Sequence, residues 1–143
     1  MINRMNSRDR ASYGALILRL SLGAMYIAHG LLKLLVFTLP GAAHYFSSLG
    51  LPGGLAYVVT AAELIGGVML ITGVYARFVA LALVPDLLGA IIWVHAHNGW
   101  LFTNPGGGWE YPAFLIAASL ALFIMGDSAF ALAPCPRGPQ AIS

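Results

Sequence analysis

Four apolar stretches separated by short turns are the feature that most restricts how this chain can fold. They cover residues 13–37, 55–74, 78–94 and 112–125. Each approaches the roughly 20 residues that a helix needs to cross a hydrocarbon core. The last is the shortest, and Trp109 and Tyr111 extend it with aromatic residues of the kind that favour the headgroup level. The pattern predicts an all-α integral membrane protein.

The composition excludes an ordinary water-soluble domain. Of the 143 residues, 59% are hydrophobic and 8% are charged, against about 25% charged in an average soluble protein. A small fold buries only about two-thirds of its unfolded surface, so the remaining apolar surface needs lipid. The single cysteine, Cys135, excludes an internal disulfide and a Cys-x-x-Cys redox pair. The scattered net charge of +2 indicates no nucleic-acid partner.

Positive charges predict the orientation, because short cytoplasmic segments collect Lys and Arg. Five arginines fall on one side of a four-span topology: Arg4, Arg8, Arg10, Arg77 and Arg137. Segments 38–54 and 98–110 on the other side carry no Lys or Arg. We therefore expect an up-down-up-down four-helix bundle over residues 13–130, with cytoplasmic tails at 1–12 and 131–143. The first stretch is too long for a secretory signal and lacks its cleavage site, so we expect a retained span.

The two outer loops carry turn residues. Pro-Gly pairs occur in 39–41, 51–54 and 104–108, and they predict irregular loops rather than continuing helix. Functional residues commonly lie on loops that a rigid scaffold positions. The outer face is therefore the first place to look for a site.

A polar stripe follows the first span. Arg19, Tyr26, His29 and Lys33 fall on one helix face at 3.6 residues per turn. A charged side chain at the centre of the bilayer costs at least about 2.5 kcal/mol, so this face should turn into the bundle. Simpler interpretations exist for both cations, because Arg19 could snorkel to the cytoplasmic side and Lys33 could be an interfacial anchor.

Two acids, Glu63 and Asp86, lie near the middle of the second and third spans. Asp86 lies about 13 Å from the cytoplasmic boundary, a level that Arg19 can also reach. We therefore predict a buried ion pair between Arg19 and one of the acids. The other acid would then be neutral and a candidate proton carrier. A purely structural role of the group in packing specificity is an equal alternative.

Small residues follow each acid by one turn. Gly66 and Gly67 come after Glu63, and Gly89 and Ala90 come after Asp86. Small residues allow the backbones of membrane helices to approach closely. We expect close helix contacts at both places.

Polar and aromatic residues should converge on the outer rim of the bundle. The candidate site residues are Tyr26, His29, Lys33, Trp93, His97, Trp109, Glu110 and Tyr111, and His44 could join them. Histidines that share a helix face at ligand spacing are missing, and His95 and His97 would point apart on a helix. No metal site is therefore expected.

Several short runs resemble a known family. They are Leu18-Arg19-Leu20, Leu22-Gly23, His29-Gly30, Lys33-Leu34, Glu63-Leu64-Ile65-Gly66-Gly67, Thr72-Gly73, Ala76-Arg77 and Gly106-Gly107-Gly108-Trp109-Glu110-Tyr111-Pro112. Over nearly the whole chain the sequence resembles the DoxX family. The resemblance implies a small four-span protein of the bacterial or archaeal cytoplasmic membrane. Some relatives are subunits of a thiosulfate-to-quinone oxidoreductase, and others are associated with membrane oxidoreductase assemblies.

Two classes of function follow. The first is an oxidoreductase subunit with a quinone or small-molecule site at the outer rim, where quinone reduction needs nearby proton donors. The sequence carries no haem, flavin or iron–sulfur signature, so electrons would come from a partner subunit. The second class is a non-catalytic anchor or assembly subunit, and either could be a homo-oligomer. A proton or small-solute pathway is less favoured, because inverted repeats and broken helices are not visible.

Overall fold

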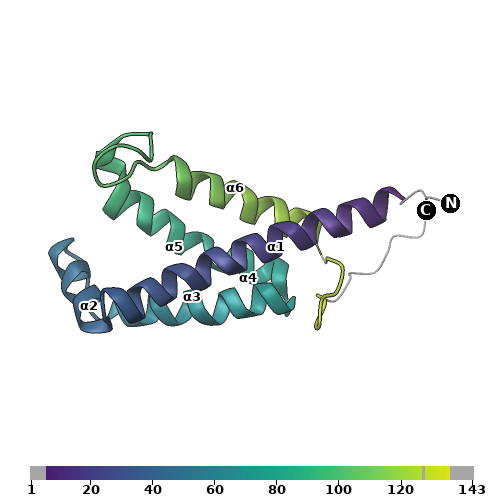
Figure 1. Ribbon diagram of the computed structural model, residues 1–143, viewed down its shortest axis with the longest axis horizontal. Helices are drawn as coiled ribbons and strands as arrows, with labels where there is room; N and C mark the ends of the chain where they lie inside the picture. The colour runs from purple at the N-terminus through teal and green to yellow at the C-terminus, as the bar shows by residue number, and fades with distance from the viewer. Residues whose placement is uncertain (1–5, 127, 136–143) are drawn as a thin grey trace.

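The computed structural model describes residues 6–126 and 128–135, and this part of the chain is all-α, as predicted. Within these described residues the helical segments are, in order, α1 (Ser7–Leu31), η1 (Leu32–Val36), α2 (Leu39–Ser48), α3 (Leu55–Thr72), α4 (Ala76–Ala82), α5 (Val84–Gly89), η2 (Ala90–His95), η3 (Ala96–Asn98) and α6 (Glu110–Met125). Figure 1 shows them as an elongated set of rods. We name its two ends. The terminal end holds Ser7, the turn 73–75 and residues 128–135, and the loop end holds α2 and residues 99–109.

Three helical stretches are long and apolar enough to cross a membrane: Ser7–Val36, Leu55–Thr72 and Ala76–Asn98. They match the first three predicted spans. The fourth, α6, is apolar but has 16 residues, which is short of the usual crossing length. Large apolar side chains are exposed along all four, as lipid-facing surfaces require. The chain is therefore a multi-pass membrane protein, while the crossing of α6 and the side of the termini stay predictions.

The first helix begins at Ser7, before the apolar stretch starts at residue 13, because a capping box defines its start. The Asn6 side chain accepts a hydrogen bond from the Arg8 amide at 2.6 Å, and the Asp9 carboxylate accepts one from the Asn6 amide at 3.3 Å. Both bonds satisfy amides that the helix leaves unpaired. Part of the segment assigned to a tail, residues 7–12, is therefore helical.

The first outer loop is not irregular throughout, as its turn residues had suggested. Residues Leu39–Ser48 form α2. Pro40 lies in the first turn, where its missing N–H costs nothing, and the Thr38 hydroxyl caps the helix by accepting from the Gly41 amide at 3.3 Å. A Pro-Gly pair therefore begins a helix here instead of ending one.

The third stretch is broken in its middle, which corrects the expectation of unbroken helices. Helix α4 ends at Ala82, and α5 begins at Val84 with Pro85 in its first turn. Proline has no N–H to donate and its ring crowds the carbonyl four residues earlier, so the helix cannot run through this point. At this break the Leu83 carbonyl accepts from the Asp86 amide at 3.2 Å, and the Tyr26 hydroxyl lies 3.4 Å from the same oxygen.

Glycines bring α1 and α3 into backbone contact. A Cβ on Gly23 would lie 2.8 Å from the Gly67 carbonyl oxygen, and one on Gly67 would lie 2.9 Å from that of Gly23. A Cβ on Gly66 would lie 2.8 Å from Leu83. The expected close contact at Gly66 and Gly67 is confirmed. At Gly89 it is wrong, because a Cβ there would meet only Trp93 of the next helical turn, at 4.0 Å.

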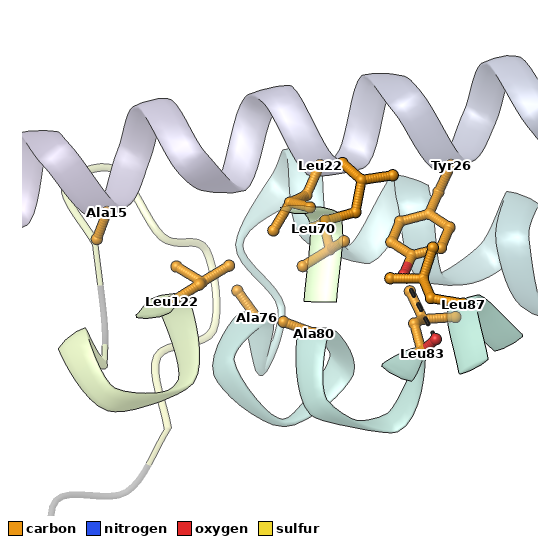
Figure 2. Packing of buried hydrophobic residues seen from close by; sticks show 10 residues of the cluster. Ala15, Leu22, Tyr26, Leu70, Ala76, Ala80, Leu83, Leu87 and Leu122 are labelled. Atoms are coloured by element: carbon orange, nitrogen blue, oxygen red, sulfur yellow. Dashed lines mark hydrogen bonds between the residues drawn. The ribbon is translucent and has the colours of Figure 1, made fainter. Parts of the chain in front are cut away.

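A buried apolar layer fills the interior toward the terminal end. Leu22 of α1, Leu70 of α3 and Leu122 of α6 are each at most 2% exposed. Ala76 and Ala80 of α4 pack into the same cluster. Figure 2 shows these side chains pointing toward one another, with Tyr26 and Leu83 at one edge of the group. The layer separates Arg19 from the polar residues of the loop end.

After α6 the chain returns across the terminal end. The amides of Leu132 and Ala133 donate to the carbonyls of Thr72 and Gly73 at 3.1 and 3.3 Å, and Tyr75 donates back to Ala133 at 2.9 Å. Residues 128–135, which we call the closing strap, therefore pair with the turn between α3 and α4. Part of the predicted cytoplasmic tail is thus ordered against the helices.

Candidate functional site

A buried ion pair joins the first and second long helices. The Nζ atom of Lys33 in η1 lies 2.7 and 2.8 Å from the two carboxylate oxygens of Glu63 in α3. The side chains are 18% and 5% exposed. Gly30 sets this approach, because a Cβ there would lie 2.7 Å from Leu64 and 3.4 Å from Glu63. The glycine lets α3 come close enough for Lys33 to meet the carboxylate.

The predicted ion pair of Arg19 with Glu63 or Asp86 is wrong, since the ion pair seen among the described residues joins Lys33 to Glu63. Arg19 is 2% exposed, and its Nη2 donates to the backbone carbonyl of Ala129 in the closing strap at 3.3 Å. Among the described residues, its Nε and Nη1 atoms have no hydrogen-bond partner. The depth estimate failed because the α1–α3 contacts place Arg19 beside Gly73, more than two turns from Glu63.

Asp86 completes the polar group from the third long helix. It lies at the start of α5, directly after Pro85. Its carboxyl interacts electrostatically with Glu63, Lys33 and His29. Tyr26 in turn lies in the field of both acids, with its hydroxyl near Ser119 of α6 and the Leu83 carbonyl. We call Tyr26, His29, Lys33, Glu63 and Asp86 the inner polar cluster.

His29 has one defined tautomer. Its Nδ1 lies 2.9 Å from the carbonyl oxygen of Met25, and a carbonyl only accepts hydrogen bonds, so Nδ1 carries the proton. Nε2 is then the nitrogen that can take up or release a proton. The ring stacks on Tyr111 of α6 with centroids 6.3 Å apart and planes inclined by 21°. His29 therefore connects the inner polar cluster to the start of α6.

An open depression of about 740 Å³ lies on the other side of Tyr111. Its lining includes His95, Trp100, Phe102, Glu110, Tyr111 and Phe114. Four of these residues are Trp, Phe or Tyr, a kind of lining that is common for small-molecule sites. We call it the outer depression.

Hydrogen bonds fold the 99–109 loop over this space. The Glu110 carboxylate accepts from the Phe102 amide at 2.8 Å. His95 Nδ1 lies 2.9 Å from the Gly107 carbonyl, so Nε2 is again the exchangeable nitrogen. The Asn98 amide donates to the carbonyls of Gly106 and Gly107, both at 3.0 Å. These bonds hold the Gly-rich segment against His95 and Asn98.

The structure divides the predicted rim residues into two groups. Tyr26, His29 and Lys33 belong to the inner polar cluster, whereas Glu110 and Tyr111 line the outer depression. Trp109 packs edge-on against Trp100, with centroids 4.4 Å apart.

The remaining candidates lie apart from both groups. Trp93 is 43% exposed, and His97 and His44 are exposed outside the lining of the depression. No group of three or more His, Cys, Asp and Glu side chains within the described residues could hold a metal ion.

Sequence reasoning did not place His95, Trp100, Phe102 or Phe114 in the site, although all of them line the depression. His95 was set aside because it points away from His97. Its partner is a backbone carbonyl twelve residues away, which no helix periodicity reveals. The three consecutive glycines at 106–108 were the available signal, since Gly106 and Gly107 have positive φ and allow the loop to fold back.

Long apolar helices around a buried charged cluster define this chain as a multi-pass membrane protein. Residues 14–96 match the sequence model of the DoxX family, and the chain belongs to that family. It is 36% identical over 121 residues to the Bacillus subtilis (strain 168) protein named "Putative oxidoreductase CatD", with 85% of each chain covered. No solved structure matches it.

Proposed function

We propose that this protein is the membrane subunit of an oxidoreductase assembly and binds a quinone headgroup in the outer depression. The observation that carries the proposal is the stacking of His29 on Tyr111. It joins an aromatic depression to a buried cluster of ionisable groups. The name of the Bacillus subtilis relative supports a link to redox chemistry.

The depression has the chemical groups that a quinone ring needs. Trp100, Phe102 and Phe114 offer apolar and aromatic surface for the ring. Reduction of a quinone takes up two electrons and two protons, so its carbonyl oxygens need donors within reach. His95 and Tyr111 supply such groups on the wall of the depression. The electrons come from a redox partner subunit in this proposal.

We also propose how the chain crosses the membrane. All four long helical segments cross the cytoplasmic membrane of a bacterium or archaeon, and both termini lie in the cytoplasm. The arginines at the terminal end, among them Arg8, Arg10 and Arg77, support this orientation. The outer depression then opens on the outer face.

One observation supports the second candidate, an anchor or assembly subunit. In the apolar part of the third stretch, Ala76–Asn98, only 17% of the residues are buried within the chain. The corresponding share is 33% in Ser7–Val36 and in Leu55–Thr72. The third stretch therefore offers the largest free surface to a partner helix or a second copy. A solute pathway is disfavoured by the apolar layer of Leu22, Leu70 and Leu122.

Calorimetric titration of the protein in lipid nanodiscs with a short-chain ubiquinone analogue tests the quinone site. We expect Tyr111→Leu to weaken binding at least about tenfold, which corresponds to about 1.4 kcal/mol. Trp93→Leu is the matched control, because Trp93 is similarly exposed but lies outside the depression. Equal affinities in the wild type and in both variants would contradict the quinone site and favour the anchor.

A further inference from the structure

The closing strap turns its large side chains outward. Phe130 and Leu132 are 77% and 75% exposed. Ala129, Ala131 and Ala133 alternate with them and are half-buried. An extended segment between a protein and water carries its apolar side chains inward and its polar ones outward. The reversed order indicates that the outer side of the strap faces an apolar medium.

Backbone hydrogen bonds fix the strap, which Figure 1 draws in yellow at the terminal end. The Ala129 amide donates to the Ser12 carbonyl of α1 at 3.3 Å. The Leu132 amide donates to the Thr72 carbonyl at the end of α3 at 3.1 Å. The strap is therefore tied to α1 on one side of Phe130 and to α3 on the other, so the exposed side chains form a defined surface.

Phe130 also holds a costly backbone conformation. Its φ is +57°, in the left-handed region that glycine and asparagine adopt more readily than a bulky residue does. Its ring packs edge-on against Tyr13, with centroids 6.4 Å apart, yet most of the side chain stays outside the fold. The contacts within the chain therefore offset little of the backbone cost, whereas burial of the ring in lipid offsets it.

Arginines lie at the same end of the molecule. Arg10 is exposed and precedes Tyr13 on α1, and the rise of the helix places it about 4.5 Å further out along the axis. Arg77 follows Tyr75, whose amide donates to the Ala133 carbonyl of the strap at 2.9 Å. Elements that lie in a membrane interface combine cations at the phosphate level with apolar side chains just below it.

We propose that the closing strap is an interfacial anchor that binds an anionic phospholipid surface. Phe130 and Leu132 insert among the acyl chains of the leaflet at the terminal end. Arg10 and Arg77 bind the lipid phosphates. The bound leaflet holds the strap closed against the helices.

Lipid binding thereby controls the cover over Arg19. Its Nη2 donates to the Ala129 carbonyl of the strap at 3.3 Å. Cys135, the single cysteine of the chain, is buried at the other end of the strap. When the strap lifts, water reaches Cys135, so the reaction of its thiol with a water-soluble reagent measures opening. Neither a quinone nor a partner subunit is needed, which makes this test independent of the proposed function.

Electron paramagnetic resonance of a spin label tests insertion. The label is attached to Phe130→Cys in a Cys135→Ser background, in nanodiscs of phosphatidylcholine with phosphatidylglycerol. We expect oxygen, which concentrates among acyl chains, to relax this label more than a water-soluble nickel complex does. Ile17→Cys, on an exposed position of the first span, should behave in the same way, and Ser7→Cys at the exposed start of α1 in the opposite way. A label at position 130 that behaves like the one at position 7 overturns insertion.

The rate of Cys135 modification in the same nanodiscs tests closure. We expect Phe130→Asn to raise it at least about tenfold, because asparagine tolerates the backbone conformation but does not insert into lipid, so local opening becomes easier. Phe130→Trp should keep the wild-type rate, which separates loss of insertion from damage to the strap. Leu35→Asn is the matched control, since Leu35 is similarly exposed near the loop end. An unchanged rate in Phe130→Asn overturns closure by lipid.

Nanodiscs of phosphatidylcholine alone test the role of headgroup charge. We expect the wild-type rate of Cys135 modification to rise at least about threefold there, because both arginines lose their attraction to an anionic surface. The double variant Arg10→Gln with Arg77→Gln should react at one rate in the two kinds of nanodisc. Equal wild-type rates in the two lipids overturn the binding of phosphates by these arginines.

Discussion

Two cations of the first helical rod, Arg19 toward the terminal end and Lys33 toward the loop end, turn inward and meet different partners. At the loop end, Lys33 meets a carboxylate at 2.7 Å. At the terminal end, Arg19 lies under the closing strap, where a backbone carbonyl accepts from it at 3.3 Å. Lys33 therefore pairs with a charged carboxylate. The described hydrogen bond of Arg19 goes to a neutral peptide carbonyl instead.

The comparison teaches that helix register, rather than depth alone, selects the partners of buried charges. Gly23 packs against Ile71 and Gly67, and Gly30 packs against Leu64. Two antiparallel helices fixed at these contacts bring Lys33 to the level of Glu63. The same contacts leave Arg19 beside Gly73, where α3 offers only backbone. Close contacts of small residues therefore decide which cation receives the acid.

The largest effect should come from Lys33→Met, which leaves Glu63 as a buried charge without its partner. We expect a loss of about 3 kcal/mol in the free energy of unfolding, the lower end of the range for broken buried pairs because Lys33 is partly exposed. The double variant Lys33→Met with Glu63→Leu should recover most of this loss. Unfolding in lipid bicelles measures both. A double variant less stable than the single one would contradict the pairing.

A smaller effect should follow at the terminal end from Gly73→Ala. Gly73 has φ +75°, and a Cβ there would overlap the Arg19 guanidinium. Gly50→Ala is the matched control, because Gly50 has φ +81° with open space around it. Both changes carry the left-handed backbone penalty of about 1 to 2 kcal/mol, so thermal unfolding should show an additional loss only for Gly73→Ala. A Cβ on Gly73 would also lie 2.7 Å from the Ala131 Cα, so equal losses would mean that neither Arg19 nor the closing strap is held against this turn.

The smallest effect belongs to Tyr26→Phe, at the boundary between the apolar layer and the inner polar cluster. The change removes a hydroxyl that donates over 3.4 Å to the Leu83 carbonyl. We expect a loss of about 0.5 to 1.5 kcal/mol, measured as a lower thermal midpoint in detergent. Tyr57→Phe at an exposed position should change nothing. Identical thermal midpoints for Tyr26→Phe and Tyr57→Phe would contradict a stabilising hydrogen bond from Tyr26 to the Leu83 carbonyl.

Much of the fold could be predicted because lipid imposes simple rules on sequence. The apolar stretches gave the three long helices within a few residues at most ends, and Gly67 marked a real backbone contact. The helix break at Leu83 could have been predicted from Pro85, whose effect is local. Helix α2 was missed because Pro40 favours a turn and a first helical turn equally, and the Thr38 cap decided between them.

The site could be predicted only in part, because its contacts cross between helices. The polar stripe on the first span correctly turned Tyr26, His29 and Lys33 inward. Periodicity within one helix does not reveal how far that helix is shifted along its axis relative to a neighbouring helix. The sequence analysis therefore paired Arg19, rather than Lys33, with a buried acid. At the 99–109 loop the His95 side chain bonds to the Gly107 carbonyl, and the Glu110 carboxylate accepts from the Phe102 amide. One partner in each bond is a backbone group, which leaves no side-chain pattern in the sequence.

The closing strap has a consequence for the order of synthesis. Arg19 is translated early, whereas the carbonyl of Ala129 that binds it is made 110 residues later. A ribosome therefore delivers the first helix to the membrane well before that contact exists. During this interval the guanidinium has to be accommodated by water, lipid headgroups or the insertion machinery. Completion of the chain, rather than insertion of any helix, is the event that seals this cation away.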